Sequence, residues 1–395
     1  MRSILVHAAG LAALAQALQG GGPPNNTTTL SLWHVVANPL LEIGGADEGG
    51  HRQFNRIRGL MRLNTSTIVV ADGASSELRY FDVTGTYLKT ASRFGSGPGE
   101  VNGFDGAFAL DDTVYAFDER GPMHVYDAQA HFVRRLDVRA LGETSGRTFG
   151  WPRGVLRGGA VVGVRRGYTN RMVLELAADS EEIVVVSDGA SGGRIVTRFP
   201  RSPVFQHASD RVPRLLGFGP LTRLAVFPRE LCAAHSSQYR IVCQDDAGHP
   251  TRTIVRATVP IQVTPAMRDT FRHDMSGALP GGGSRYPPEA RAYREEAART
   301  EAFADVLPAF GRLVAARTGE LWVSDSRPED SMVGFQAAAP TATSHWRVFG
   351  PKGVEVGDVT LPARFFLYDA GTDWVLGVSR DDDDVERVVM LRLVR

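Results

Sequence analysis

The residues with the clearest chemical potential are charged side chains at one position of a repeating pattern. Six segments of the chain share a rhythm of short apolar runs, and this position marks the start of the first run in each. The six residues, named here the charged ring, are Arg58, Asp105, Arg153, Arg223, Arg312 and Arg364. Guanidinium groups that converge repel one another unless an anion, a carboxylate or solvent compensates them. Asp105 cannot balance five cations, so we expect these forks to bind a carboxylate or another anion.

The same arginines have a plainer explanation, which stays open at this point. Lys89 and Lys352 are the only lysines among 44 basic residues, so arginine is abundant throughout the chain. Coding from a GC-rich genome would produce this bias, and a need for planar, permanently charged anion-binding groups would produce it too. In the plainer case the ring arginines turn outward to neighbouring carboxylates.

The spacing of the pattern predicts the elements that position these residues. Arg58-Gly59-Leu60, Asp105-Gly106-Ala107 and Arg153-Gly154-Val155 follow one another at steps of 47 and 48 residues. A four-stranded propeller blade repeats every ~40–50 residues. We therefore expect an all-β fold, a six-bladed β-propeller whose innermost strands line a central channel. The six expected units are 57–93, 107–138, 154–199, 223–259, 312–361 and 364–394.

Two shortages at the chain ends predict how the ring of blades closes. The last unit has only three strand candidates before Arg395, and the N-terminal run Leu30–Val36 has no hairpin partner of its own. If Leu30–Val36 becomes the fourth strand of the last blade, two exposed sheet edges disappear together. The propeller is therefore expected to span residues 30–395.

One stretch of the chain resembles a known repeat family. Within Phe54–Glu100, the runs Ile68–Asp72, Arg79–Asp82 and Phe94–Glu100 look like an NHL repeat, with Val101 where that family has Phe. The resemblance implies a six-bladed β-propeller. It implies no single activity, because such propellers serve as binding platforms, sensors, lactonase-like hydrolases and lyases.

Two segments lengthen the repeat and predict where the fold is elaborated. The excess lies in Pro200–Pro220 and in Thr264–Leu307, the second between units four and five. Thr264 and Pro265 are typical of a helix start before Met267–Met275, and Pro288–Phe303 reads as a second, surface helix. We expect this helical insertion, about 264–307, to cover the channel mouth. Its side chains Arg268, Arg272 and His273 would then face the charged ring.

The N-terminus predicts export. Arg2 is followed by an apolar run to Leu18, and Ala15-Gln16-Ala17 offers a cleavage site of small residues. Residues 1–17 are therefore expected to be a signal peptide and 18–29 a linker, with the mature protein periplasmic or secreted. No other run approaches the ~18 apolar residues that a membrane span requires.

The two cysteines offer two outcomes. Cys232 and Cys243 lie on successive strand candidates, and a four-residue loop between these strands would place them directly opposite each other. They then form a cross-strand disulfide in an exported protein, or they remain two buried thiols.

Composition and motifs narrow the functional classes. Acidic and basic residues number 44 each, which argues against nucleic acid as a partner. No cofactor motif occurs, and no metal site is expected: Asp381–Asp384 is typical of a solvated turn rather than a Ca²⁺ loop. Asp72, Asp118 and Asp325 recur after second strands, where they cap turns or converge on a metal.

The sequence therefore favours an exported binding module that recognises an anionic small molecule, a glycan or a peptide on its loop-rich face. One alternative is an enzyme of lactonase or lyase type with a metal in the channel. The other is a protein-interaction scaffold with a broad apolar patch. Whether the protein is an enzyme and its oligomeric state both stay open.

Overall fold

The fold is described by a computed structural model. It describes residues 31–64, 66–118, 121–144, 147–167, 180–189, 192–208, 214–277, 287–331, 342–381 and 383–395. Residues 31–395 form one unit. The expected signal peptide and linker lie outside the described residues. Among the helices that the structure describes, none combines the length and apolar character needed to cross a bilayer.

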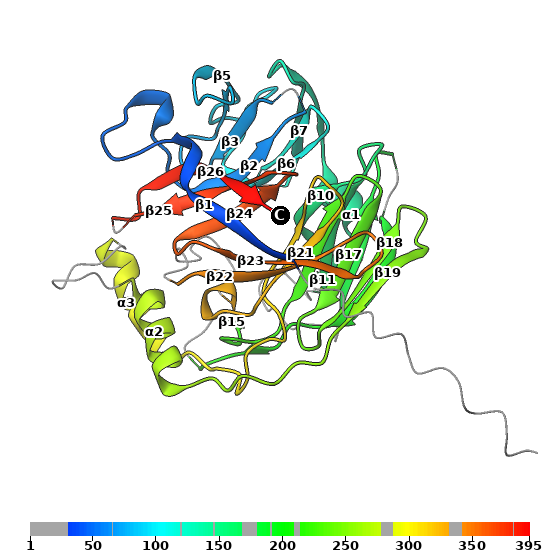
Figure 1. Cartoon of the computed structure of the whole chain (residues 1–395), viewed down its shortest axis with the longest axis vertical. Helices are drawn as coiled ribbons and strands as arrows, with labels where there is room; N and C mark the ends of the chain where they lie inside the picture. The colour runs from blue at the N-terminus through cyan, green and yellow to red at the C-terminus, as the bar shows by residue number, and fades with distance from the viewer. Residues whose placement is uncertain are drawn as a thin grey trace, which may run out of the picture. The chain divides into compact units, whose positions relative to one another are not determined.

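Four antiparallel sheets of four strands follow one another along the chain (Figure 1). The first two are β2 (Ile57–Arg62), β3 (Ile68–Asp72), β4 (Glu77–Phe81) and β5 (Tyr87–Ala91), and β6 (Phe104–Leu110), β7 (Thr113–Asp118), β8 (Met123–Tyr126) and β9 (Phe132–Leu136). The next two are β10 (Arg147–Val155), β11 (Val161–Gly167), β12 (Ser180–Val186) and β13 (Arg194–Pro200), and β16 (Thr222–Phe227), β17 (Glu230–His235), β18 (Arg240–Asp245) and β19 (Pro250–Val255).

Eight further strands form one sheet that contains both ends of the described unit. Its order is β20 (Leu313–Ala315), β21 (Leu321–Ser324), β22 (Ser344–Phe349), β23 (Glu355–Leu361), β1 (Ser31–Ile43), β26 (Glu386–Val394), β25 (Trp374–Arg380) and β24 (Phe365–Ala370). The N-terminal strand β1 joins the C-terminal strands, as the sequence predicts. It runs antiparallel to β26, with His34 opposite Val394. Its first residues also pair in parallel with β23. Figure 1 shows β1 in blue beside β26 in red.

The first strand of each group contacts the first strand of the next and so arranges the sheets around an axis. Contacts join β2 to β6, β6 to β10, β10 to β16, β16 to β20, β20 to β24, and β24 back to β2. The arrangement is a β-propeller-like one. Second strands such as β3 are buried along their whole length because both of their faces pack against neighbouring sheets. The apolar core therefore lies between the sheets, in clusters that each draw on two neighbours.

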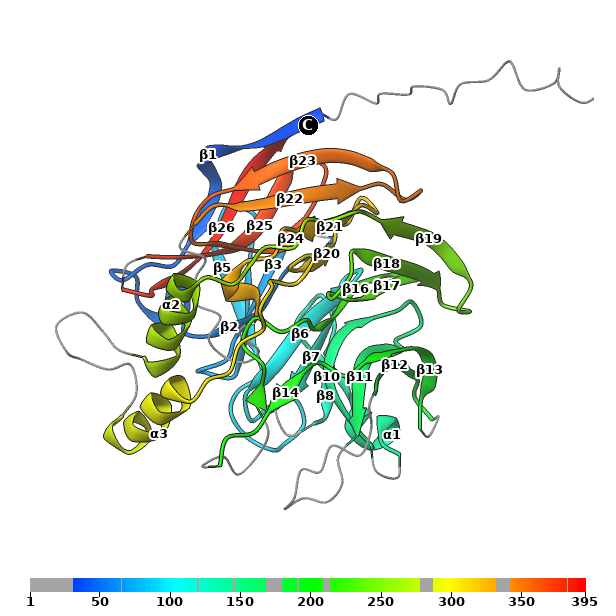
Figure 2. The same ribbon diagram turned by 90° about the horizontal axis from the view of Figure 1, so that it is seen from below.

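Two helices lie between β19 and β20, and they pack side by side (Figure 2). Helix α2 (Pro265–Ser276) begins as expected, because the Thr264 hydroxyl accepts a hydrogen bond from the amide of Met267. Helix α3 (Pro288–Arg299) ends four residues before the expected Phe303. The Thr300 hydroxyl bonds back to the Glu296 carbonyl at that point, and the chain then pairs with Gly217.

The first elaborated segment carries the short hairpin β14 (Val204–Phe205) and β15 (Arg214–Leu215). It shares a small core with the helices, in which Phe218 packs on Phe271 and Phe303 at ring-centroid distances of 5.0 and 5.3 Å. The two long insertions therefore pack together as one satellite of the sheets. The remaining short elements are α1 (Val138–Gly142), η1 (Gly50–Arg52) and η2 (Pro328–Ser331).

Candidate functional site

The inner strands line a cavity of about 840 Å³. Five members of the charged ring line it: Arg58, Asp105, Arg153, Arg223 and Arg312. The sixth, Arg364, does not. It lies in the turn before β24, with a backbone φ of 62°. Five of the six residues of the charged ring, which the sequence pattern brought together, therefore line this cavity.

Strand irregularities explain which residue takes the sixth place. Arg58, Asp105 and Arg153 each lie where the pairing of the inner strand shifts by one residue, at a β-bulge. A bulge leaves its extra residue outside the regular alternation and re-aims its side chain. In β24 the equivalent shift falls between Leu367 and Asp369, at Tyr368. Tyr368 lines the cavity in place of Arg364.

Electrostatic interactions link the cavity residues around the ring. Arg153 interacts with Asp105 and Arg223, and Arg223 interacts with Arg312. Tyr368 extends this series, because it interacts with both Arg312 and Arg58. The charged groups that the sequence separates by some 250 residues therefore lie close enough to influence one another's protonation.

The glycine that follows two of the ring residues permits this closeness. A Cβ at Gly59 would lie 2.7 Å from the Cβ of Ala107, and a Cβ at Gly154 would lie 2.6 Å from the Cβ of Val226. Each neighbour belongs to the next inner strand. In each Arg-Gly pair, the arginine lines the cavity, and the glycine allows the adjacent inner strand to approach closely.

Arg153 is a member of the charged ring whose guanidinium has no direct partner among the described residues. Its side chain is exposed to the cavity, yet protein surrounds it. Within the described part of the chain, no hydrogen bond or ion pair reaches its guanidinium. Burial lowers the pKa of Arg153 to about 10, with the nearby Asp105 carboxylate opposing this shift and Arg223 adding to it. The group stays charged at neutral pH.

Arg312 is held in place by an aromatic ring. Its guanidinium carbon lies 3.7 Å from the ring centroid of Phe366, a cation–π contact. Its Nη2 donates to the carbonyl of Leu367 at 2.9 Å, while the buried Nη1 has no hydrogen-bond partner among the described residues. Burial lowers the pKa of Arg312 to about 10, and Asp330 opposes the shift. The side chain is fixed but incompletely satisfied.

Arg223 has the same character. Its Nη2 donates to the backbone carbonyl of Asp330 at 2.6 Å, and its buried Nε finds no hydrogen-bond partner in the described residues. Burial lowers its pKa, and the Asp330 charge opposes that shift. Asp330 comes from η2, and the sequence analysis did not single it out because nothing local marks a loop carboxylate as buried.

The helical insertion does not contribute its arginines to the cavity. Arg272 and Arg268 lie over the ring of Phe303, at 5.0 and 6.0 Å from its centroid. His273 lies beside Asp274 and is exposed. None of the three is among the residues that line the cavity. The expectation that they face the charged ring is therefore wrong, because the insertion's own aromatic core holds the two arginines.

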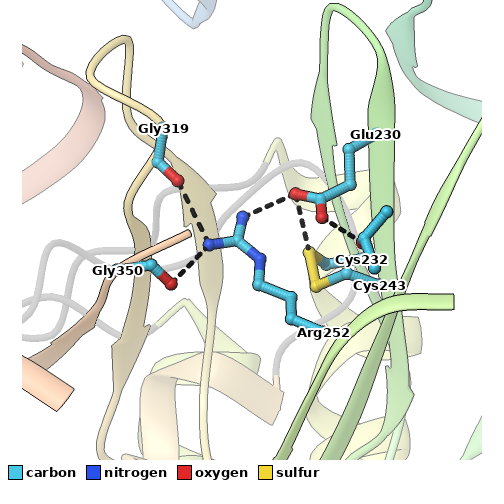
Figure 3. The surroundings of a disulfide bond; sticks show 7 residues. Glu230, Cys232, Cys243, Arg252, Gly319 and Gly350 are labelled. Atoms are coloured by element: carbon cyan, nitrogen blue, oxygen red, sulfur yellow. Dashed lines mark hydrogen bonds and ion pairs between the residues drawn. A yellow bond between two sulfur atoms is a disulfide. The ribbon is translucent and has the colours of Figure 1, made fainter. Parts of the chain in front are cut away.

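The structure contains the disulfide between Cys232 and Cys243. The two residues lie directly opposite on β17 and β18. Figure 3 shows Glu230 beside them, with its carboxylate bound to Arg252 at 2.6 Å, and Arg252 reaching the Gly350 carbonyl at 2.8 Å. This network ties the sheet of β16–β19 to the next sheet.

Potential metal ligands gather at one place in the described residues, Glu230 with Cys232 and Cys243. Sulfur atoms bonded to each other are not thiolate ligands, so this group does not fit a metal. Asp72 and Asp118 accept hydrogen bonds from the backbone amides of Ala74 and Asn102. Asp325 binds His345 and Arg347. These three carboxylates do not line the cavity.

Comparisons with known proteins show a likeness in fold. No family model matches it, and no curated protein matches it. Among solved structures, a DUF4221-family member from Bacteroides vulgatus is similar with a TM-score of 0.52 and 8% identity, over 92% of this chain and 99% of that one. Regucalcin, a calcium-binding protein from Agrobacterium tumefaciens, matches with a TM-score of 0.39 and 13% identity, over 92% and 96%. Virginiamycin B lyase from Staphylococcus aureus matches with a TM-score of 0.40 and 9% identity, over 89% and 98%. The chain thus shares an overall fold with the DUF4221-family structure.

Proposed function

We propose that this protein is an exported, six-bladed β-propeller that binds an anionic small molecule, glycan or peptide in its central cavity. The blade count rests on reading the eight-stranded sheet as two blades that meet at β1. β20–β23 then form one blade, and β24–β26 with β1 form the last. The closed circle of six contacting inner strands supports this count. Export rests on the expected signal peptide at residues 1–17.

The observation that carries the binding proposal is the unmet charge of Arg153, Arg223 and Arg312. Burial lowers the pKa of all three. Arg223 and Arg312 are half-buried, and each keeps a buried guanidinium nitrogen without a hydrogen-bond partner among the described residues, whereas Arg153 is exposed to the cavity. Desolvating a charge is costly unless a partner of opposite charge replaces the water. An anionic ligand that receives hydrogen bonds from these guanidinium groups recovers that cost on binding.

The residues that line the cavity carry a net positive charge, which favours an anionic ligand. Eight arginines and four carboxylates are among the residues that line the cavity. A concave site with an excess of one charge focuses its field and concentrates ligands of the opposite charge. Arg312 is already held against Phe366, so part of the ordering cost of binding is met before the ligand arrives.

The alternative function, a metal-dependent enzyme, requires a cavity lined by ligands for a cation rather than for an anion. A cation in the channel needs several carboxylate, amide or imidazole ligands. Asp105 is the one carboxylate of the charged ring, and arginines disfavour a second cation beside it. Elemental analysis of the purified protein separates the two functions, since a bound stoichiometric divalent metal would support the enzyme.

The binding proposal is tested with citrate as the probe anion. We expect citrate to raise the melting temperature of the wild type, because a ligand at 100 times its Kd stabilises the folded state by about 2.7 kcal/mol. Arg153→Ala should remove this response and leave the fold intact, since that guanidinium makes no ion pair in the described residues. The matched control is Arg134→Ala, which removes an exposed arginine paired with Asp188. If the Arg153 and Arg134 variants respond to citrate alike, the cavity is not the anion site.

A further inference from the structure

The carboxylate of Asp330 is the buried counter-charge behind the cavity arginines. Its side chain is 3% exposed and belongs to η2, the short helix that follows β21. Two contacts hold it to Arg327, whose Nη2 lies 3.4 Å from the Asp330 Oδ1 and whose backbone amide lies 3.2 Å from Oδ2. η2 is also in contact with α2. The carboxylate is therefore fixed in place rather than free to follow a ligand.

Its position couples it to two members of the charged ring. The Asp330 backbone carbonyl accepts the hydrogen bond from Arg223. A Cβ built on Gly311, the residue before Arg312, would fall 2.3 Å from the Asp330 Oδ2, so this oxygen packs directly on the Gly311 backbone. Asp330 is a favourable electrostatic partner for both Arg223 and Arg312. Yet it does not line the cavity.

A carboxylate in this position lowers the affinity of the cavity for anions without occupying it. It sits on the protein side of Arg223 and Arg312 and offsets part of their charge, as Asp105 does for Arg153. A ligand with one negative charge then meets cations that are each partly neutralised, and gains little for the hydration that it loses. A ligand with several negative charges engages Arg153, Arg223 and Arg312 together and sums their attraction.

We propose that Asp330 sets the charge specificity of the cavity and restricts it to ligands that carry two or more negative charges. This inference rests on the proposed function. Asp330 thus acts as a specificity residue that disfavours ligands with a single negative charge. The preferred ligand class is a multivalent anion such as a di- or tricarboxylate. Arg327 serves as its positioning residue, because it holds the carboxylate behind the ring.

The experiment compares citrate with acetate by isothermal titration calorimetry, for the wild type and for Asp330→Asn. The asparagine keeps the shape of the side chain and removes its charge. We expect Asp330→Asn to bind citrate about tenfold more tightly than the wild type, within the usual range of coupling free energies between sites. We also expect acetate binding to become measurable in that variant. Asp188→Asn removes the same charge from an exposed pair with Arg134 and should leave both affinities unchanged.

The possible outcomes distinguish a failure of the specificity role of Asp330 from a failure of the proposed anion-binding function. If citrate binds the wild type and Asp330→Asn equally while Arg153→Ala abolishes binding, the specificity role is overturned and the anion site stands. If citrate binds none of the proteins, the anion site fails and the specificity role fails with it. The wild type alone gives a test that needs no folded variant: acetate binding within tenfold of citrate overturns the role of Asp330.

Discussion

The guanidinium of Arg214 donates a hydrogen bond to the carboxylate of Glu301 at 2.9 Å. The same side chain reaches the Ala297 carbonyl at 2.6 Å and the Thr300 hydroxyl at 2.7 Å, at the end of α3. One arginine therefore joins the insertion before β16 to the insertion before β20. A cation at the C-terminal end of a helix also interacts favourably with the helix dipole. The satellite next to the sheets is thus held by a polar contact as well as by its aromatic core.

Removing this contact should loosen the satellite without unfolding the sheets. The side chains of Arg214 and Glu301 are 12% and 3% exposed, so Arg214→Ala leaves a buried carboxylate without its main partner. Breaking a buried pair in this way costs about 3–5 kcal/mol. We expect faster hydrogen exchange of the α3 amides, measured by mass spectrometry, while the amides of β3 keep their protection.

An exposed pair in the same helix provides the control. Arg299 and Glu296 are 70% and 39% exposed and lie 2.7 Å apart. Surface pairs contribute about 0–1 kcal/mol, so Arg299→Ala should leave the exchange of α3 nearly unchanged. Equal exchange in the Arg214 and Arg299 variants would show that the aromatic core alone holds the helices.

The disulfide should contribute measurably to stability. It closes a loop with a sequence separation of 11 residues between Cys232 and Cys243. A loop of this size restricts the unfolded chain by about 2–3 kcal/mol. We expect a lower guanidinium midpoint for the double variant Cys232→Ala, Cys243→Ala. Dithiothreitol should lower the wild-type midpoint in the same direction and leave that of the double variant unchanged, which separates the bond from the lost side-chain volume. A wild type that is indifferent to reduction would contradict the prediction.

His124 should make the protein less stable as the pH falls toward 5. The residue is 2% exposed, and its two ring nitrogens are buried without a hydrogen-bond partner among the described residues. Burial lowers the pKa of His124 in the folded state, with Asp118 opposing and Arg135 adding to the shift. Below the ordinary value of about 6.5, the unfolded chain therefore takes up a proton that the folded chain refuses. The free energy of unfolding then falls with falling pH, by at most about 1.4 kcal/mol per unit for this group.

Denaturant unfolding at pH 7.5, 6.5 and 5.5 checks this dependence. Burial lowers the pKa of His235 as well, so the two histidines act in the same direction. His124→Met should flatten the decline in stability between pH 7.5 and 5.5. His249→Met, at an exposed histidine paired with Asp245, should not. A decline that is equally steep in both variants would assign the pH dependence to other groups.

Much of the fold follows from local patterns that can be read in the chain. The spacing of the apolar runs predicted sheets of short strands, and the shortages at the two ends predicted that β1 joins the C-terminal strands, where it pairs with β26. Thr264 before Pro265 predicted the start of α2. These features depend on residues that are close in sequence, or on a simple count of strands, and so require no knowledge of the packing. The end of α3 was missed because Thr300 and the pairing of the next residues with Gly217 terminate it.

For the candidate site too, local sequence patterns predicted one part and the packing of distant segments decided the other. The sequence by itself determined that charged residues recur at one position of the repeat, and five of them do line one cavity. The expectation that this position starts each inner strand is wrong for Arg153, because β10 already begins at Arg147. Only the tertiary structure decided that Tyr368 rather than Arg364 lines the cavity, because a bulge shifts the register of β24. It also decided that Asp330 lies behind Arg223, and that Arg272 stacks on Phe303 away from the cavity. Periodicity indicates which residues lie on or next to an inner strand, whereas the direction and the partner of a long side chain depend on bulges and on segments distant in the chain.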